Sequence, residues 1–212
     1  MTALVLALVA LGVAPLLDRA LQGRPLAEGF ADGFSQVAVA GLLLAHVVPA
    51  GFAAAGWPAL GALVAGVVLG VVAHRLPRGE DTAEVVAALA LLLHAGLDGA
   101  GLRAGGVLGW TVVLHTLPVG LATWRITRER RGQRAAAVLL ALCGAVTVVG
   151  FLATGLVVTG ASPAVLGVVQ CLAAGALLHV LTHLGEHAPR GATAWGALAG
   201  VALVVMLSSL GG

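Results

Sequence analysis

The chain is poor in charged and aromatic residues. Only 9% of its 212 residues are charged and 4% are aromatic, and it contains neither lysine nor tyrosine. A soluble domain of this length could not cover its apolar surface with so few charges. No basic stripe interleaved with aromatic side chains is present, so nucleic acid is not expected as a partner. The low charge excludes an ordinary soluble domain and predicts membrane lipid as the surroundings of the protein.

Cysteine is equally scarce. Cys143 and Cys171 are the two cysteines, and both lie within apolar runs. Cysteines in such surroundings usually act as small packing residues. We therefore expect no disulfide, and the cysteines carry no information on the redox compartment.

Apolar runs are abundant instead. Hydrophobic residues make up 60% of the chain, and the mean hydropathy is +1.07. A membrane-spanning helix needs about 17–25 mostly apolar residues. Such runs predict an all-α, polytopic membrane protein with one transmembrane domain over residues 1–212 and eight spans, at about 3–21, 34–56, 58–74, 83–102, 106–125, 135–159, 163–184 and 192–210. The first is the weakest because Asp18 and Arg19 interrupt it, and no basic residue precedes its apolar core, so we expect an uncleaved span rather than a signal peptide.

The distribution of the arginines predicts how the chain is oriented in the membrane. Ten of the eleven lie in connections of one parity between these spans, and only Arg103 lies in a connection of the other. Basic residues concentrate on the cytoplasmic side of a membrane protein. This distribution predicts that both termini lie outside and that residues 128–134 lie inside. The composition, rich in alanine, glycine and arginine, favours a bacterial cytoplasmic membrane.

Tryptophan and glycine fit the same arrangement. The four tryptophans, Trp57, Trp110, Trp124 and Trp195, lie near the ends of spans, where an aromatic belt is expected. Glycines recur at a spacing of four, as in Gly66-x3-Gly70 and Gly196-x3-Gly200. Small residues at this spacing let membrane helices approach closely. We expect a tightly packed helical bundle.

Three ionisable residues lie deep within two consecutive apolar runs. His94 and Asp98 are four residues apart, which puts them on one face of the fourth span, and His115 is central in the fifth. Ionisable groups at this depth are costly and therefore indicate a functional site. Two imidazoles and a carboxylate can bind a divalent transition metal, with water completing the shell. The alternative is a structural one, in which His94 and Asp98 form a satisfied buried pair and His115 bonds a backbone carbonyl.

Helix-weakening residues accompany this set. Pro118 lies three residues after His115, and Gly99 and Gly120 flank the two segments. Proline removes a backbone donor, so we expect the helix to loosen here and expose carbonyls, as the broken helices of transporters do.

Four short segments resemble the motifs of the ZIP (Zrt/Irt-like) metal transporter family. They are His94-Ala-Gly-Leu-Asp98-Gly99, His115-Thr-Leu-Pro118-Val-Gly120, His46-Val-Val-Pro49 and Ala174-Gly175-Ala-Leu-Leu-His179. The family also has eight spans with both termini outside. The resemblance covers essentially the whole chain and implies a divergent bacterial member that transports a divalent metal.

The chain lacks several carboxylate residues and one amide residue that the family motifs contain. Ala95 stands where the family has Asn, and Ala50, Thr116 and Val119 stand where it has acidic residues. The family often holds two metals in a bridged site that uses those positions. The resemblance here implies a reduced site for one metal, held by His94, Asp98 and His115, and selective for metals that prefer nitrogen, such as zinc.

Further histidines extend beyond this set. His179, His183, Glu186 and His187 lie toward the cytoplasmic end of the seventh span, and His74 lies at that end of the third. The resemblance implies that they form the exit of the metal path or a secondary metal site, and that His46 lines the entrance. The alternative is an ordinary polar cap near the lipid headgroups.

The first functional interpretation is therefore transport of a divalent metal, zinc foremost, by alternating access around a site at the membrane midplane. It involves no catalytic residues and no cofactor, since the metal is the substrate, and it is compatible with a homodimer. A second interpretation is an intramembrane zinc hydrolase that uses His179-x3-His183, with Glu186 activating the water. A third is a degenerate ZIP-like bundle without transport.

Overall fold

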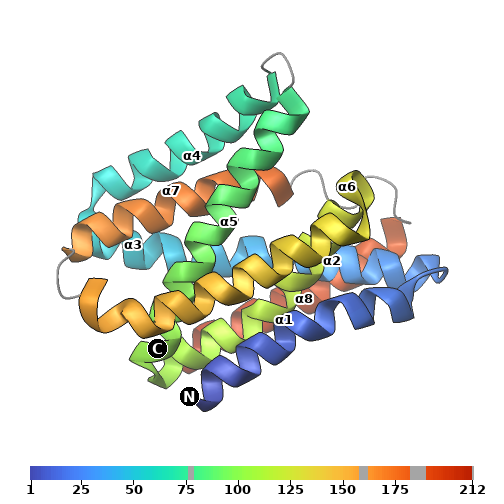
Figure 1. Cartoon of the computed structure of the whole chain (residues 1–212), viewed down its shortest axis with the longest axis horizontal. Coiled ribbons are helices and arrows are strands. Elements are labelled where there is room, and N and C mark those ends of the chain that lie inside the picture. Colours follow the sequence, from blue (N-terminus) through green and yellow to red (C-terminus); the bar gives the residue numbers. More distant parts are fainter. Residues whose placement is uncertain (76–78, 158–161, 182–189, 212) are drawn as a thin grey trace.

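The computed structural model describes residues 1–75, 79–157, 162–181 and 190–211, and within these ranges it contains helices and no strand (Figure 1). The elements are α1 (Thr2–Leu21), α2 (Pro25–Leu42), the π-helix η1 (Leu43–Val47), α3 (Val48–Ala55), α4 (Trp57–Arg75), α5 (Gly79–Ala104), α6 (Gly106–Val157), α7 (Pro163–Leu181) and α8 (Arg190–Gly211).

Among the described residues, six helical stretches are long and apolar enough to cross a membrane. They are Thr2–Leu21, Pro25–Ala55, Trp57–Arg75, Glu84–Arg103, Val112–Thr154 and Gly191–Ser209, and Pro163–His179 is a shorter apolar helix. The prediction of an all-α chain is thereby confirmed for the described residues, and several of its helices are able to span a membrane. Val112–Thr154 is 43 residues long, about twice what one crossing needs.

A single glycine divides α6. Gly132 has φ 84° and ψ 171°, a backbone conformation that is essentially restricted to glycine. The helix therefore consists of two halves, 106–131 and 133–157, and in Figure 1 the chain reverses direction near the label α6. We expected a connection of about nine residues between spans ending at 125 and starting at 135. The helices instead extend to Gly132 from both sides, because one glycine suffices for the turn and the flanking arginines remain helical.

The second span is longer than expected and contains the irregular helical segment. It begins at Pro25 rather than near residue 34, since proline is well suited to the first position of a helix. The π-helix η1 lies directly before Pro49, where it absorbs the loss of a backbone donor. The loosening expected at Pro118 is wrong, because α6 keeps helical backbone angles there.

One group of helices is α1, α5 and α6, in which α1 and α5 pack against α6. Of the remaining helices, α2 packs against α8, and α3 and α4 pack against α7; they meet the first group where α5 contacts α4 and α7 and where α2 contacts α6. Glycines allow the close approach, because a Cβ at Gly196 would overlap the Phe30 carbonyl of α2, and one at Gly66 would overlap the Leu172 carbonyl of α7. The predicted packing role of both glycine pairs is confirmed.

Both chain termini lie at the same end of the bundle in Figure 1. The connection between α1 and α2 and the turn within α6 lie at the opposite end. The arginine-rich segment around Gly132 is thus remote from the termini.

Candidate metal centre

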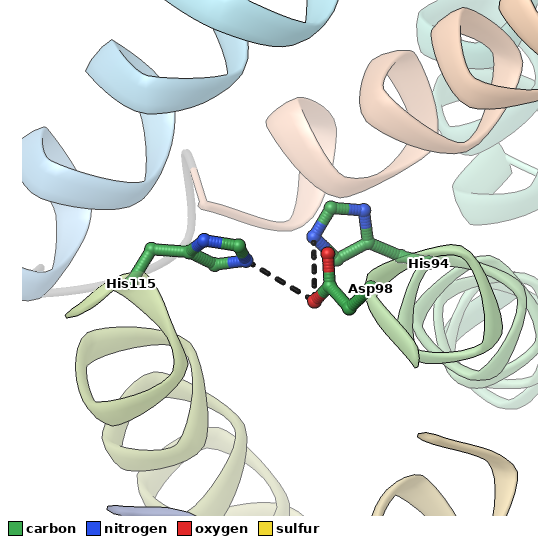
Figure 2. Close-up of side chains that lie close together, drawn as sticks. All are labelled: His94, Asp98 and His115. Atoms are coloured by element: carbon green, nitrogen blue, oxygen red, sulfur yellow. Dashed lines mark hydrogen bonds and ion pairs between the residues drawn. The ribbon is translucent and has the colours of Figure 1, made fainter. Parts of the chain in front are cut away.

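The three ionisable residues predicted as metal ligands lie together inside the bundle. His94 and Asp98 come from neighbouring turns of α5, and His115 comes from the first half of α6 (Figure 2). The Oδ2 atom of Asp98 lies 3.1 Å from Nε2 of His115 and 3.5 Å from Nε2 of His94. The two imidazole rings have their centroids 5.7 Å apart. One carboxylate oxygen therefore joins two imidazoles from different helices.

These donor atoms are close enough together to hold a metal ion. One ligand atom from each residue lies within 4.8 Å of the others. Tetrahedral zinc with bonds of about 2.0–2.1 Å keeps its ligands about 3.3 Å apart. The two contacts to Asp98 bracket that value, so an ion could replace the direct contacts with small movements of the side chains.

The three side chains are buried, so a charge on any of them is energetically costly unless it has a partner. His94 is 6% exposed, and the side chains of Asp98 and His115 are also largely buried. A charged carboxylate in apolar surroundings must be paired or bind a cation. The imidazoles supply that partner in the absence of metal, so the same three groups can form either a hydrogen-bonded cluster or a metal shell.

Two cavities meet beside this cluster. A small cavity of about 30 Å³ is lined by His94 and Asp98, together with Thr116, Cys143, Thr147 and apolar side chains. A large one of about 610 Å³ lies between α4, α5, α6 and α7. Leu91, Val119 and Thr123 line both cavities, so the two cavities are neighbours.

The charged lining of the large cavity comes from α5 and α6. Arg131 pairs with Asp81 and Glu84, and Nη1 of Arg130 lies 3.7 Å from Oε1 of Glu84. Arg130 and Arg131 belong to the segment 128–134, which is expected on the cytoplasmic side. The charges are balanced, and the remaining lining is mostly apolar.

The other predicted pathway residues are only partly brought together. His74 and His179 both line the large cavity, with ring centroids 6.2 Å apart. His46 lies in η1, half buried, and is not among the lining residues of either cavity. His183, Glu186 and His187 lie outside the described residues. His74 and His179 are thus separate from the cluster around Asp98.

A second buried polar cluster was missed by the sequence analysis. Asp18, expected to interrupt the first span, is 1% exposed within a continuous α1. It accepts hydrogen bonds from Nε2 of Gln22 and Nε1 of Trp124, both at 3.0 Å, and Nη1 of Arg128 also lies 3.0 Å from it. Arg125 contacts two acids: its Nη1 lies 3.1 Å from Asp32 of α2, and its Nε lies 3.7 Å from Asp18.

The expected belt position of Trp124 is therefore wrong. Trp57, Trp110 and Trp195 are exposed, as a belt requires, whereas Trp124 is 8% exposed and bonds to Asp18. Spacing along the chain does not reveal which acidic and basic residues pair.

No protein-family model matches the chain, and no curated protein is significantly similar to it. The interpretation of the site consequently depends on its own geometry.

Proposed function

We propose that this protein transports a divalent transition metal, zinc foremost, across a bacterial cytoplasmic membrane, using His94, Asp98 and His115 as the site. The observation that carries the proposal is the approach of two imidazoles to one buried carboxylate, at ligand-like spacing, beside a large cavity. The short motifs that resemble the ZIP family are consistent with it.

The ligand chemistry favours zinc. Imidazole nitrogens and a carboxylate oxygen suit zinc and similar transition metals better than magnesium or calcium, which prefer shells of oxygen. The small cavity of about 30 Å³ exceeds the about 10–15 Å³ that one water needs, so there is room for an ion beside the cluster.

The helix grouping supports a mechanism of alternating access. All three ligands come from α5 and α6, which belong to the group with α1. A movement of this group against α2, α3, α4, α7 and α8 would carry the site as a unit without breaking it. The large cavity would then be the release path on one side.

We further propose that α6 crosses the membrane twice, which makes eight spans with both termini outside. The break at Gly132, the length of α6 and the position of the arginines beside the turn support this topology.

The metal site is tested by elemental analysis of the purified protein. Each of His94→Ala, Asp98→Ala and His115→Ala should remove most of the bound zinc, because even changes beyond the ligands typically cost about 10–100-fold in affinity. Thr154→Ala is the control, since its hydroxyl only bonds the Gly150 carbonyl of its own helix. Unchanged metal content in all three ligand variants would contradict the assignment.

Transport itself requires a second measurement. Proteoliposomes loaded with a zinc-sensitive dye should fill faster with the full chain than with His115→Ala. A protein that binds zinc normally but gives no flux above the variant would be the degenerate bundle rather than a transporter.

A further inference from the structure

Cys143 is buried next to the proposed metal site but is not one of its three ligands. It lies in the second half of α6, is 4% exposed, and lines the small cavity together with His94 and Asp98. Two of the three hydroxyls that line it are directed to their own helix, since Thr116 donates to the Val112 carbonyl and Thr147 to the Cys143 carbonyl. The thiol is the one sulfur donor among the residues that line this cavity.

The packing of α5 against the second half of α6 places Cys143 at the level of the cluster. A Cβ on Gly99 would overlap the Thr147 carbonyl, and the guanidinium of Arg103 lies 5.2 Å from the ring centroid of Phe151. One turn back along both helices, the same alignment places Cys143 opposite Ala95, the neighbour of His94. Both residues belong to one buried cluster.

Charge gives a reason for a fourth ligand. A divalent ion held by one carboxylate and two neutral imidazoles keeps a net positive charge in apolar surroundings, which is costly. A thiolate, formed as the ion binds and the thiol proton is released, would neutralise the complex.

We propose that Cys143 supplies a sulfur ligand to the transported ion and thereby restricts the site to thiophilic metals, such as zinc and cadmium, over manganese and magnesium. The proposal rests on the proposed metal site. Cys143 is outside the group whose ligand atoms lie within 4.8 Å of one another, so the sulfur moves toward the ion on binding. The resulting shell of one sulfur, two nitrogens and one oxygen is suited to tetrahedral zinc.

Cobalt is the direct probe, because a thiolate bound to Co²⁺ gives a charge-transfer band in the near ultraviolet that imidazole and carboxylate do not give. The full chain loaded with Co²⁺ should show this band. Cys143→Ser should bind Co²⁺ without it. Cys171→Ala is the matched control and should keep the band, because Cys171 is equally buried but packs in α7 against Gly51.

Metal preference is the second readout. Cys143→Ser should weaken cadmium binding about 100-fold or more, at the upper end of the effect of changes around the ligands, and leave manganese binding nearly unchanged. Binding of Co²⁺ to the full chain without the band, or a Cys143→Ser variant that still prefers cadmium, would overturn the sulfur ligand and leave the three-ligand site intact. A full chain that binds none of these ions would overturn both proposals.

Discussion

At the scale of single residues, buried charge in the described part of the chain is gathered into two clusters with different consequences. Around Asp98 the acid has only imidazole partners, which can release it to a metal ion. Around Asp18 the acid faces permanently charged guanidinium groups and an indole donor. A carboxylate paired with arginine is not readily available to a metal, so we assign a structural role to the second cluster.

Removing the acid of the second cluster should destabilise the protein strongly. Asp18→Ala removes the carboxylate that Arg128 and Trp124 contact and leaves Arg125 with Asp32 alone, and breaking a buried ion pair costs about 3–5 kcal/mol. Glu129→Ala is the control, because Glu129 is exposed and its contact with Arg128, at 3.7 Å, is a surface pair worth about 0–1 kcal/mol. Denaturant unfolding in detergent compares the two. Equal losses would show that the buried cluster does not stabilise the fold.

At the scale of elements, irregular backbone occurs where a specific residue requires it. The π-helix η1 precedes Pro49, and the break in α6 coincides with Gly132, whereas Pro118 sits within regular helix. Pro118 is fully buried, so surrounding side chains hold this part of α6 in shape. The candidate ligand His115, one turn earlier, is thereby carried on a rigid helix rather than on a broken one.

Substitution of Gly132 tests the turn of α6. Gly132→Ala forces a Cβ into a backbone region that costs about 1–3 kcal/mol for other residues. The unfolding free energy should fall by that amount. Gly12→Ala should leave stability nearly unchanged, because Gly12 is in the α1 helix with open space around its Cβ position. If both variants unfold alike, the turn is not centred on Gly132.

At the scale of the whole molecule, the arrangement of the helices decides whether the site can face both sides. The candidate ligands belong to α5 and α6, while the large cavity also borders α4 and α7. The proposed alternating access would therefore depend on the contacts of α5 and α6 with these helices, and on α6 crossing the membrane twice.

Thiol labelling tests that crossing. In a variant without native cysteines (Cys143→Ser, Cys171→Ala), a single cysteine is introduced by Gln133→Cys or by Ser162→Cys, both at exposed positions. An impermeant maleimide should label the first only from the cytoplasmic side and the second only from outside. Labelling of both from the same side would mean that residues 133–157 do not cross the membrane.

The sequence by itself determined the class of the protein and part of its site. Scarce charge and long apolar runs require a helical membrane protein, because backbone groups in lipid must be satisfied within helices. The four-residue spacing placed His94 and Asp98 on one face of α5, since helical geometry is local.

The tertiary structure alone decided the contacts between helices. It brought His115 to Asp98, paired Asp18 with Arg128, and turned Cys143 toward the small cavity. The sequence analysis could propose His115 from its depth, but it treated Asp18 as an interruption and Cys143 as packing. Which side chains meet depends on how helix surfaces interlock, and that is a property of the assembled bundle rather than of any spacing along the chain.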